Sequence, residues 1–369
     1  MYLHLKTSIF LLLLTLVSYA GTPEQADSLI ENYYASLPDD TGKVNMLYTT
    51  GYDLRTKDIE VAFKYANACL NSAITTKSDK HIAKAKNLLG ILYFRTGKLN
   101  KALDLHREAL ALREKINDRE GIAFSKVNIA NIYVDQKLEE KAKTLYLEAL
   151  QIFSTIGNKK LTANTLNNIG IILFGNKEFE NAGNYFKQAL KTGEELNDYE
   201  LKAFTYNNLG AVYENLENFT EARICFEEAL ELRELMGNES EQADTYINIA
   251  STYFEQKEFS KAKSLLTKAL VLSTSNDYSE GKLSVYNFLK DIYISENKYD
   301  SALIYQTKYY ELKESLLVVE PEEKTIEPNP TTDTNAVAEL KKENHILKYI
   351  VGVLSVFLVI LGIAIKRLK

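Results

Sequence analysis

The sequence predicts an all-α protein whose helices are arranged as repeated pairs in an α-solenoid. The 369-residue chain holds only 5 Pro and 16 Gly, and no Pro occurs from Asp39 to Glu320. Proline breaks helices, so this interval favours long uninterrupted helices over the many turns of a β-domain. The same interval repeats with a period of 40 residues, and each period holds two amphipathic segments at helical spacing.

Small residues mark the repeat because they return at a fixed register. The first series is Ala62, Ala102, Ala142, Ala182, Ala222, Ala262 and Ala302. A second series, seven positions later, is Cys69, Ala109, Ala149, Ala189, Ala229 and Ala269. A third, twelve positions before the first, is Gly90, Ala130, Gly170, Gly210 and Ala250. Small residues let two helices approach closely, so we expect about seven helix pairs over residues 41–318.

The boundaries between units carry residues that end helices. They read Asn117-Asp118, Gly157-Asn158, Asn197-Asp198 and Gly237-Asn238. Gly and Asn tolerate the left-handed conformation that closes a helix. The first unit, with Thr50 and Asp53, and the last, with Lys290 at the small position, depart from the pattern. Terminal units of a solenoid are often atypical because one of their faces meets water.

The repeated residues resemble the tetratricopeptide repeat (TPR). That family's pattern is an aromatic residue, Leu-Gly, Tyr, Ala, an aromatic and Ala, and the corresponding residues here are Tyr206, Leu209, Gly210, Tyr213, Ala222, Phe226 and Ala229. The 40-residue unit is similar to the extended-helix subgroup found in cell-polarity adaptors, kinesin light chains and bacterial quorum-response regulators. The resemblance implies a superhelix that binds protein segments on its concave side.

Asparagine also returns at the period of 40. One row is Asn128, Asn168, Asn208 and Asn248, and a partial row one residue earlier is Asn167, Asn207 and Asn287. Asn is a modest helix former, so its recurrence at one register calls for a reason. Its side chain carries a donor and an acceptor, which matches a peptide backbone. By the resemblance, these residues face the groove and bind peptide; the alternative is that they link adjacent units.

Positions beside this row offer specificity. Phe94, Val134, Phe174 and Phe254 lie four residues beyond the small position, and Glu214 interrupts their row. Such side chains either accept a partner's anchor residues or pack between helices. Charge is mixed along the repeats, so no phosphate or carboxylate clamp is predicted.

No catalytic site is predicted, and neither is a cofactor or a metal. The chain contains four His and lacks the HExxH, GxxxxGK[ST], GxSxG and GxGxxG motifs. Cys69 and Cys225 are expected to be buried, unbridged thiols. The net charge of −6 argues against nucleic-acid binding. We therefore expect no enzymatic activity.

The first twenty residues are typical of a signal peptide. Lys6 precedes the apolar stretch Ser8–Val17, and Ser18 and Ala20 provide a small-residue cleavage site. The alternative is a short anchor that stays attached. Residues 21–40 are expected to form a capping helix over Glu24–Leu37.

The C-terminal part predicts a tether and a single membrane span. Residues 319–335 form an acidic, Pro-rich linker, and residues 336–348 a juxtamembrane helix that is either a simple stalk or a means of self-association. Residues 349–365 are uncharged and apolar, as a transmembrane helix requires. The basic tail, residues 366–369, predicts a cytoplasmic C-terminus and places the repeats outside the cytoplasm, in the periplasm if the source is bacterial.

The function predicted from these features is a non-enzymatic, membrane-anchored adaptor that binds an extended peptide or protein segment in its concave groove. Its partner is not identified by the sequence. The alternative is a sensor, because the segment order resembles the input half of bacterial TPR-containing sensor kinases and regulators, without their output domain. An assembly factor for envelope complexes would share every one of these features.

Overall fold

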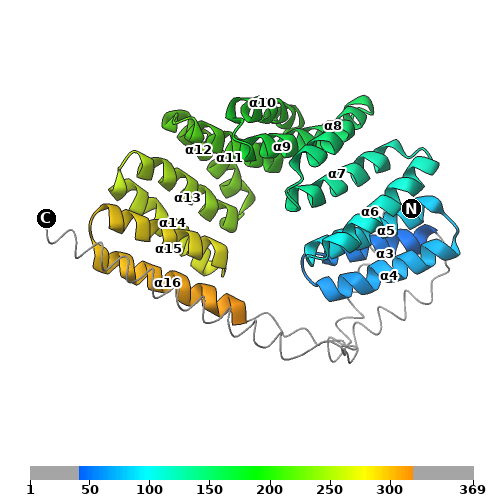
Figure 1. Ribbon diagram of the computed structural model, residues 1–369, viewed down its shortest axis with the longest axis horizontal. Helices are drawn as coiled ribbons and strands as arrows, with labels where there is room; N and C mark the ends of the chain where they lie inside the picture. The colour runs from blue at the N-terminus through cyan, green and yellow to red at the C-terminus, as the bar shows by residue number, and fades with distance from the viewer. Residues whose placement is uncertain (1–40, 319–369) are drawn as a thin grey trace. The chain divides into compact units, whose positions relative to one another are not determined.

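The computed structural model describes residues 41–318, which form fourteen α-helices and no strand within that range (Figure 1). The helices are α3 (Thr41–Leu54), α4 (Ile59–Thr75), α5 (Asp79–Arg95), α6 (Leu99–Lys115), α7 (Arg119–Asp135), α8 (Glu139–Thr155), α9 (Lys159–Gly175), α10 (Phe179–Leu196), α11 (Tyr199–Asn215), α12 (Phe219–Met236), α13 (Glu239–Glu255), α14 (Phe259–Ser275), α15 (Ser279–Ser295) and α16 (Tyr299–Val318). The prediction of an all-α solenoid of about seven helix pairs is confirmed.

Several predictions concern residues 1–40 and 319–369, which lie outside the described residues. They are the signal peptide, the capping helix, the acidic linker, the juxtamembrane helix and the apolar segment 349–365. Among the helices of residues 41–318, none is both long enough and apolar enough to span a membrane. The membrane anchor therefore remains a prediction from the sequence.

The helices pack as successive pairs. Within the compact unit that extends to Tyr309, each first helix from α3 to α13 packs on its second helix. Each second helix from α4 to α14 packs on the first helix of the next pair. First helices of neighbouring pairs also contact each other, as α9 with α11 and α11 with α13 do. Figure 1 shows α7, α9, α11 and α13 on the inner side of the row and α8, α10 and α12 on its outer side.

Small residues on the first helices receive bulky rings from the second helices. A Cβ atom added to Gly170 would lie 2.5 Å from the ring of Phe186, and one added to Gly210 would lie 2.5 Å from the ring of Phe226. Both rings are fully buried. The expectation that small residues allow close helix approach is therefore confirmed, and the ring fills the space that a larger residue would occupy.

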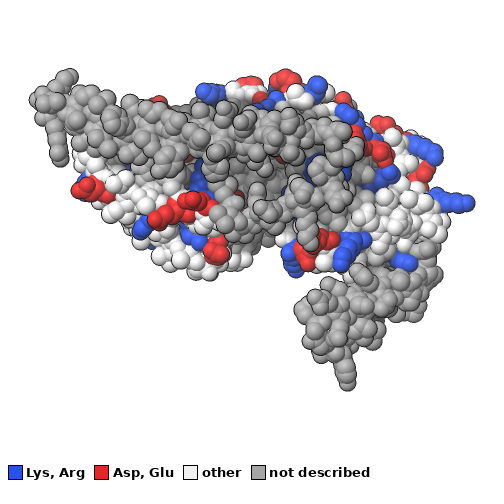
Figure 2. All heavy atoms as spheres, turned by 60° about the horizontal axis from the view of Figure 1, so that its bottom comes forward, with Lys and Arg blue, Asp and Glu red and all other residues white. Residues whose placement is uncertain are grey.

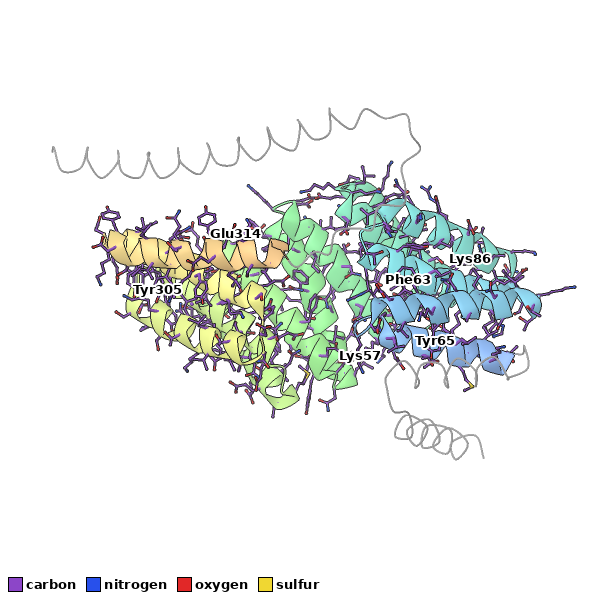
Figure 3. All side chains as sticks on the ribbon, turned by 90° about the horizontal axis from the view of Figure 1, so that it is seen from below. Lys57, Phe63, Tyr65, Lys86, Tyr305 and Glu314 are labelled. Carbon is purple, nitrogen blue, oxygen red and sulfur yellow. The ribbon has the colours of Figure 1, made fainter. Side chains whose placement is uncertain are left out.

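Aromatic contacts continue this core towards both ends of the array. On α4, Phe63 packs against Tyr93 of α5 with ring centroids 5.0 Å apart. At the other end, Tyr305 of α16 stacks on Tyr293 of α15 at 5.5 Å. Figure 3 labels Phe63 and Tyr305 on their helices. The core within residues 41–318 is thus a series of clusters along the array, as a repeat architecture requires.

A residue in the left-handed conformation follows nearly every helix. These residues recur every twenty positions: Lys77, Gly97, Asn117, Lys137, Gly157, Lys177, Asn197, Glu217, Gly237, Lys257, Asp277 and Asn297. The four Gly and Asn residues that the sequence places between units are among them. The left-handed residue reverses the chain within a few positions, which keeps successive helices side by side.

The second residue of each boundary dipeptide caps the following helix, which the sequence pattern did not predict. Asp118, Asn158, Asp198 and Asn238 each accept a hydrogen bond from the backbone N–H three residues later. They are therefore N-caps of α7, α9, α11 and α13, and an N-cap of this kind stabilises a helix by about 1 kcal/mol. Each boundary dipeptide ends one helix and begins the next.

The left-handed turns make a prediction about stability. Gly157 has φ +75° and open space where a Cβ would lie, so Gly157→Ala introduces backbone strain without a clash. We expect this change to lower the free energy of unfolding by about 1 kcal/mol, as measured by chemical denaturation. Lys177→Gly, at φ +62°, is the reciprocal change and should raise it by a smaller amount. Shifts of both variants in the same direction would contradict this account.

Candidate functional site

The first helices lie on the inner side of the row (Figure 1), and we define the inner face by seven equivalent positions on each of them. On α11 they are Glu200, Phe204, Asn207, Asn208, Ala211, Glu214 and Asn215, all of them half-buried or exposed. The same positions, shifted by multiples of 40, define the inner face on α5, α7, α9, α13 and α15. The asparagine row Asn128, Asn168, Asn208 and Asn248 lies on this face, one residue on each of α7, α9, α11 and α13.

Two members of the row hydrogen-bond to the preceding unit. Asn128 Nδ2 donates to Asn87 Oδ1 at 2.8 Å, and Asn248 Nδ2 donates to Asn207 Oδ1 at 2.8 Å. Both bonds cross from one helix pair to the next. These two amides therefore have a structural task in linking units, which is the alternative interpretation of the asparagine row.

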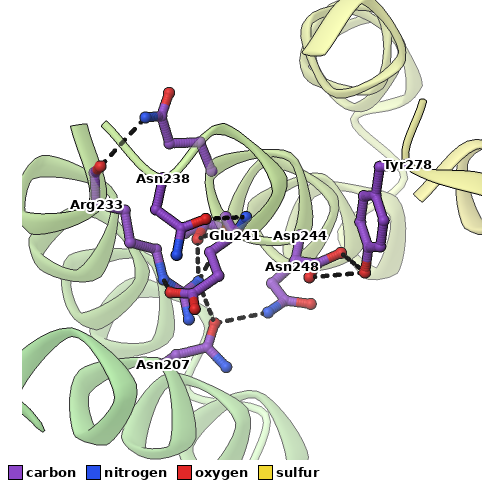
Figure 4. Close-up of polar contacts among 9 residues, drawn as sticks. Asn207, Arg233, Asn238, Glu241, Asp244, Asn248 and Tyr278 are labelled. Carbon is purple, nitrogen blue, oxygen red and sulfur yellow. Dashed lines mark hydrogen bonds and ion pairs between the residues drawn. The ribbon is translucent and has the colours of Figure 1, made fainter. Parts of the chain in front are cut away.

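The two accepting asparagines are equivalent nodes three units apart. Asn87 Oδ1 also contacts His106 Nδ1 at 3.1 Å. Asn207 Oδ1 also accepts from Arg233 Nη1 at 3.4 Å, and Figure 4 shows this node together with Asn248. Each node joins two first helices and the second helix of the earlier pair. We call them the Asn87 node and the Asn207 node.

Arg233 extends the Asn207 node into the next unit. The guanidinium is buried, donates from Nη1 to the carbonyl of Glu241 at 3.1 Å and to Thr245 Oγ1, and its Nε lies 3.1 Å from Glu241 Oε2 (Figure 4). Arg113, three units earlier, donates in the same way to the carbonyl of Gly121 at 2.9 Å and to Ser125 Oγ at 2.7 Å. These arginines fasten a second helix to the first turn of the following pair.

The three members of the partial row, one residue earlier, differ in burial. Asn167 is buried and donates from Nδ2 to Thr205 Oγ1 at 2.9 Å. Asn207 is the node described above, whereas Asn287 is exposed and accepts from Lys290. Burial of Asn167 and the bonds of Asn207 commit both side chains to contacts between units.

Asn168 and Asn208 differ from the other members of the row. Neither side chain forms a hydrogen bond within residues 41–318, and Asn208 Nδ2 is enclosed without a partner. The register explains both cases. The residue 41 positions before Asn168 is Val127, which cannot accept a bond, and the one before Asn208 is Asn167, which is turned to Thr205. The ligand-binding role of the row stays a prediction.

The apolar row beside the asparagines, which consists of Phe94, Val134, Phe174 and Phe254, packs largely against other residues of the protein. Phe174 contacts Phe179 with centroids 5.4 Å apart, and Phe254 contacts Phe259 at 5.8 Å and Phe288 at 6.2 Å. Glu214, which interrupts the row, has an enclosed Oε1 without a hydrogen-bond partner within the described residues, and burial raises the pKa of its carboxyl group above the usual value, against a lowering effect of Ser251. Half-buried rings of this kind leave only part of their surface to a partner.

The exposed apolar residues of the inner face are others, which the sequence pattern did not single out. Phe124, Ile171, Phe204 and Ile294 are 37%, 40%, 43% and 46% exposed. The first three lie on α7, α9 and α11, close to Asn168 and Asn208, and Ile294 lies on α15. Phe124 and Phe204 occupy the same register two units apart, but spacing alone does not show which side chains the stacked pairs leave exposed.

A cavity of about 310 Å³ opens beside Phe204. It is lined by Lys160, Asn164, Asp198, Glu200, Leu201, Phe204 and Glu241, from the N-terminal turns of α9, α11 and α13 and the residue before α11. Lys160 is held by Asp198 at 2.7 Å, whereas Glu200 forms no ion pair within the described residues. The cavity combines an exposed ring with carboxylates.

Neither cysteine chemistry nor metal binding is indicated within residues 41–318. No group of three or more His, Cys, Asp or Glu side chains there is placed to hold a metal ion. Cys69 and Cys225 are unbridged and buried, as expected, and burial raises the pKa of their thiols to about 12 and about 11. Thiols with such pKa values stay protonated and unreactive near neutral pH.

Comparison with known proteins identifies the family. The tetratricopeptide repeat family matches residues 51–115, 121–195, 161–235, 201–275 and 241–315, and the chain belongs to this family. No curated protein sequence is similar enough to count as a match.

Solved structures share the fold at low identity. The apo form of RapI is 16% identical with a TM-score of 0.61, over 75% of this chain and 99% of that one. A Rap protein complexed with competence and sporulation factor is 14% identical with a TM-score of 0.56, over 81% and 94%. A signal transduction ATPase with a tetratricopeptide repeat sensor from Pyrococcus horikoshii is 18% identical with a TM-score of 0.63, over 80% of this chain and 46% of that one.

His106 makes the Asn87 node sensitive to pH. Burial, with a smaller effect of Arg113, lowers the pKa of its imidazole from 6.5 to about 4. The folded protein therefore takes up this proton at lower pH than the unfolded chain. The contribution of neutral His106 to the free energy of unfolding is fully present above pH 6.5. This contribution is lost as the pH falls from 6.5 towards 4.

The prediction uses His106→Phe, because Phe186 and Phe226 occupy the equivalent position in later pairs. Between pH 7.5 and pH 5, the wild type should lose about 2 kcal/mol more unfolding free energy than the variant. The comparison cancels the titration of the carboxylates that both proteins share. Parallel pH profiles measured by urea denaturation would show that His106 titrates normally.

Proposed function

We propose that this chain is a non-enzymatic adaptor that holds an extended protein or peptide segment against the inner face of its TPR array. The observation that carries the proposal is the pair Asn168 and Asn208. These two asparagines lie at the centre of the array, on the inner face, and lack hydrogen-bond partners within the described residues. Their neighbours in the same row are occupied by bonds between units.

The chemistry of these amides suits a peptide main chain. Each amide offers one acceptor and a two-hydrogen donor, so it can bond to a backbone N–H and C=O without reading the side chains. A buried amide without a partner costs roughly 1–3 kcal/mol, which a ligand carbonyl would relieve after rotation of the Asn208 side chain. Phe124, Ile171 and Phe204 supply apolar contact area on the same helices.

The fold is compatible with this use. A protein of similar fold has been solved in complex with competence and sporulation factor. At 14% identity this supports the capacity of the fold to hold a ligand and says nothing about which ligand this chain takes.

The adaptor is proposed to be membrane-anchored, with its repeats outside the cytoplasm. The support comes from sequence alone: the signal-like residues 1–20, the uncharged segment 349–365 and the basic tail 366–369. A single span with this tail orients the C-terminus to the cytoplasm. No chemistry of its own is assigned to the protein.

The groove prediction is tested with Asn168→Ala/Asn208→Ala in the full-length chain. Partners are captured from membranes by cross-linking and quantified by mass spectrometry. We expect at least a tenfold loss of captured partner, because two bonds to a main chain are removed. The matched control is Asn71→Ala/Asn184→Ala, which removes two exposed asparagines from second helices α4 and α10. Equal recovery by the double variant and the wild type would refute the groove assignment.

The topology prediction is tested by protease added to intact spheroplasts of an expressing bacterium. The repeats should be degraded, while a tag placed after Lys369 remains protected until the membrane is permeabilised. Protection of the repeats would overturn the proposed orientation.

A second candidate is a sensing module that transmits a binding event to another membrane protein. The order of segments in the sequence favours it, and one protein of similar fold carries its repeats as a sensor. The two candidates share the groove and differ in the consequence of binding. A sensor requires a lateral partner whose activity changes when the inner face is occupied, whereas an adaptor does not.

A further inference from the structure

Charges of opposite sign are segregated along the inner face, although charge is mixed along the repeats as a whole. At its seven positions, α5 has three cations and no acid: Lys80, Lys84 and Arg95. At the same positions, α11, α13 and α15 have six acids and no cation: Glu200, Glu214, Asp244, Glu255, Glu280 and Asp291. Between them, α7 and α9 contribute Glu120, Asp135 and Lys160, a net charge of −1. Figure 2 shows Lys and Arg side chains next to Asp and Glu side chains where described residues are visible on that face.

Several of the charges at the two ends lack a counter-charge within the described residues, whereas Asp291 pairs with Lys290 at 3.1 Å. Lys80, Lys84 and Arg95 form no ion pair within the described residues, and Lys84 is met only by Asn45 Oδ1 at 3.0 Å and the ring of Tyr48 at 4.2 Å. At the other end, Glu200, Glu255 and Glu280 are likewise without an ion pair within residues 41–318. A partner of opposite charge would therefore meet charges that are not already neutralised.

Neighbouring acids also act on one another. Burial and the nearby Glu255 raise the pKa of Glu214. Burial raises the pKa of Asp244, and Glu241 and Glu280 raise it further, against the lowering effects of Tyr278 and Arg233. The acidic end is thus a region where added positive charge is favourable.

The cavity beside Phe204 gives the acidic end a place for one side chain. A Lys or Arg stem can pack along the exposed ring of Phe204 while its cation lies among Glu200 and Glu241, which line the same cavity. Glu241 is shared with Arg233, so Glu200 is the unpaired carboxylate of the two.

We propose that the inner face accepts an extended protein segment in one direction only, with acidic residues against α5 and basic residues against α11, α13 and α15. The inference rests on the proposed groove function and adds the chemistry and polarity of the partner. First helices spaced about 10 Å apart put α5 and α11 about 30 Å apart. An extended chain at about 3.3 Å per residue covers that distance in about nine residues.

The test uses two synthetic thirteen-residue peptides of identical composition, labelled at the central residue. The block peptide has four Asp, five uncharged residues and four Arg. The mixed peptide has the same charges in alternation. Affinity for the full-length chain is measured by fluorescence anisotropy at 20 mM and 500 mM salt. We expect the block peptide to bind at least tenfold more tightly at low salt, and the advantage to shrink at high salt because ions screen exposed charges.

Direction is read by a photo-cross-linker at the Asp end of the block peptide. Cross-links should fall on α5 and its neighbours in the wild type. In a variant with Lys80→Glu, Arg95→Glu, Glu200→Lys and Glu280→Lys, they should move to α11–α15. The matched control, Lys191→Glu/Glu231→Lys, reverses exposed charges on outer helices α10 and α12 and should change neither affinity nor cross-link position.

The outcomes separate this inference from the groove function. Equal affinity for both peptides, or cross-links shared between the two ends, overturns the charge polarity. If both peptides then still lose affinity in Asn168→Ala/Asn208→Ala, the groove function stands without it. If neither peptide binds, or the asparagine variant binds as the wild type does, both proposals fail.

Discussion

The constraint on which this structure depends is the fixed length of its helices and turns. From α4 to α15 every helix has 17 or 18 residues, and a left-handed residue reverses the chain every twenty positions. Equivalent side chains are therefore carried to equivalent places on successive pairs. A single insertion in one helix would move the following side chains by about 100° around its axis and break every row.

The same register lets neighbouring units form hydrogen bonds with polar groups of the inner face. An asparagine on one first helix is within reach of the residue 41 positions earlier, and where that residue is Asn87 or Asn207 the two side chains bond. The nodes strengthen a stack whose cohesion depends on nearest neighbours. At the centre of the array the residue 41 positions earlier is Val127, which cannot accept a bond, or Asn167, which already bonds to Thr205. Asn168 and Asn208 therefore form no such hydrogen bond. The polar groups available for the proposed binding are therefore those that the contacts between units leave without a hydrogen bond.

The fold was largely predictable because it depends on local and periodic features. Gly210 opposite Phe226, and Asn117 or Gly157 at the unit boundaries, are readable from spacing alone. The division of the asparagine row was not, because Asn128 and Asn168 look alike and differ only in their neighbours on another helix. In the same way, Phe204 is exposed and Phe226 is fully buried, although both are aromatic residues of helical repeats. Which face a side chain takes depends on how the pairs stack.

The most direct measurement of this account is the free energy of unfolding of four single variants: Asn128→Ala, Asn168→Ala, Asn208→Ala and Asn248→Ala. The account predicts that the first and last each lose about 1 kcal/mol or more, since each leaves a node without its donor. It predicts a clearly smaller loss for Asn168→Ala, and no loss or a slight gain for Asn208→Ala, whose enclosed Nδ2 has no partner within the described residues. Equal losses at all four positions, or larger losses at the two central ones, would contradict it.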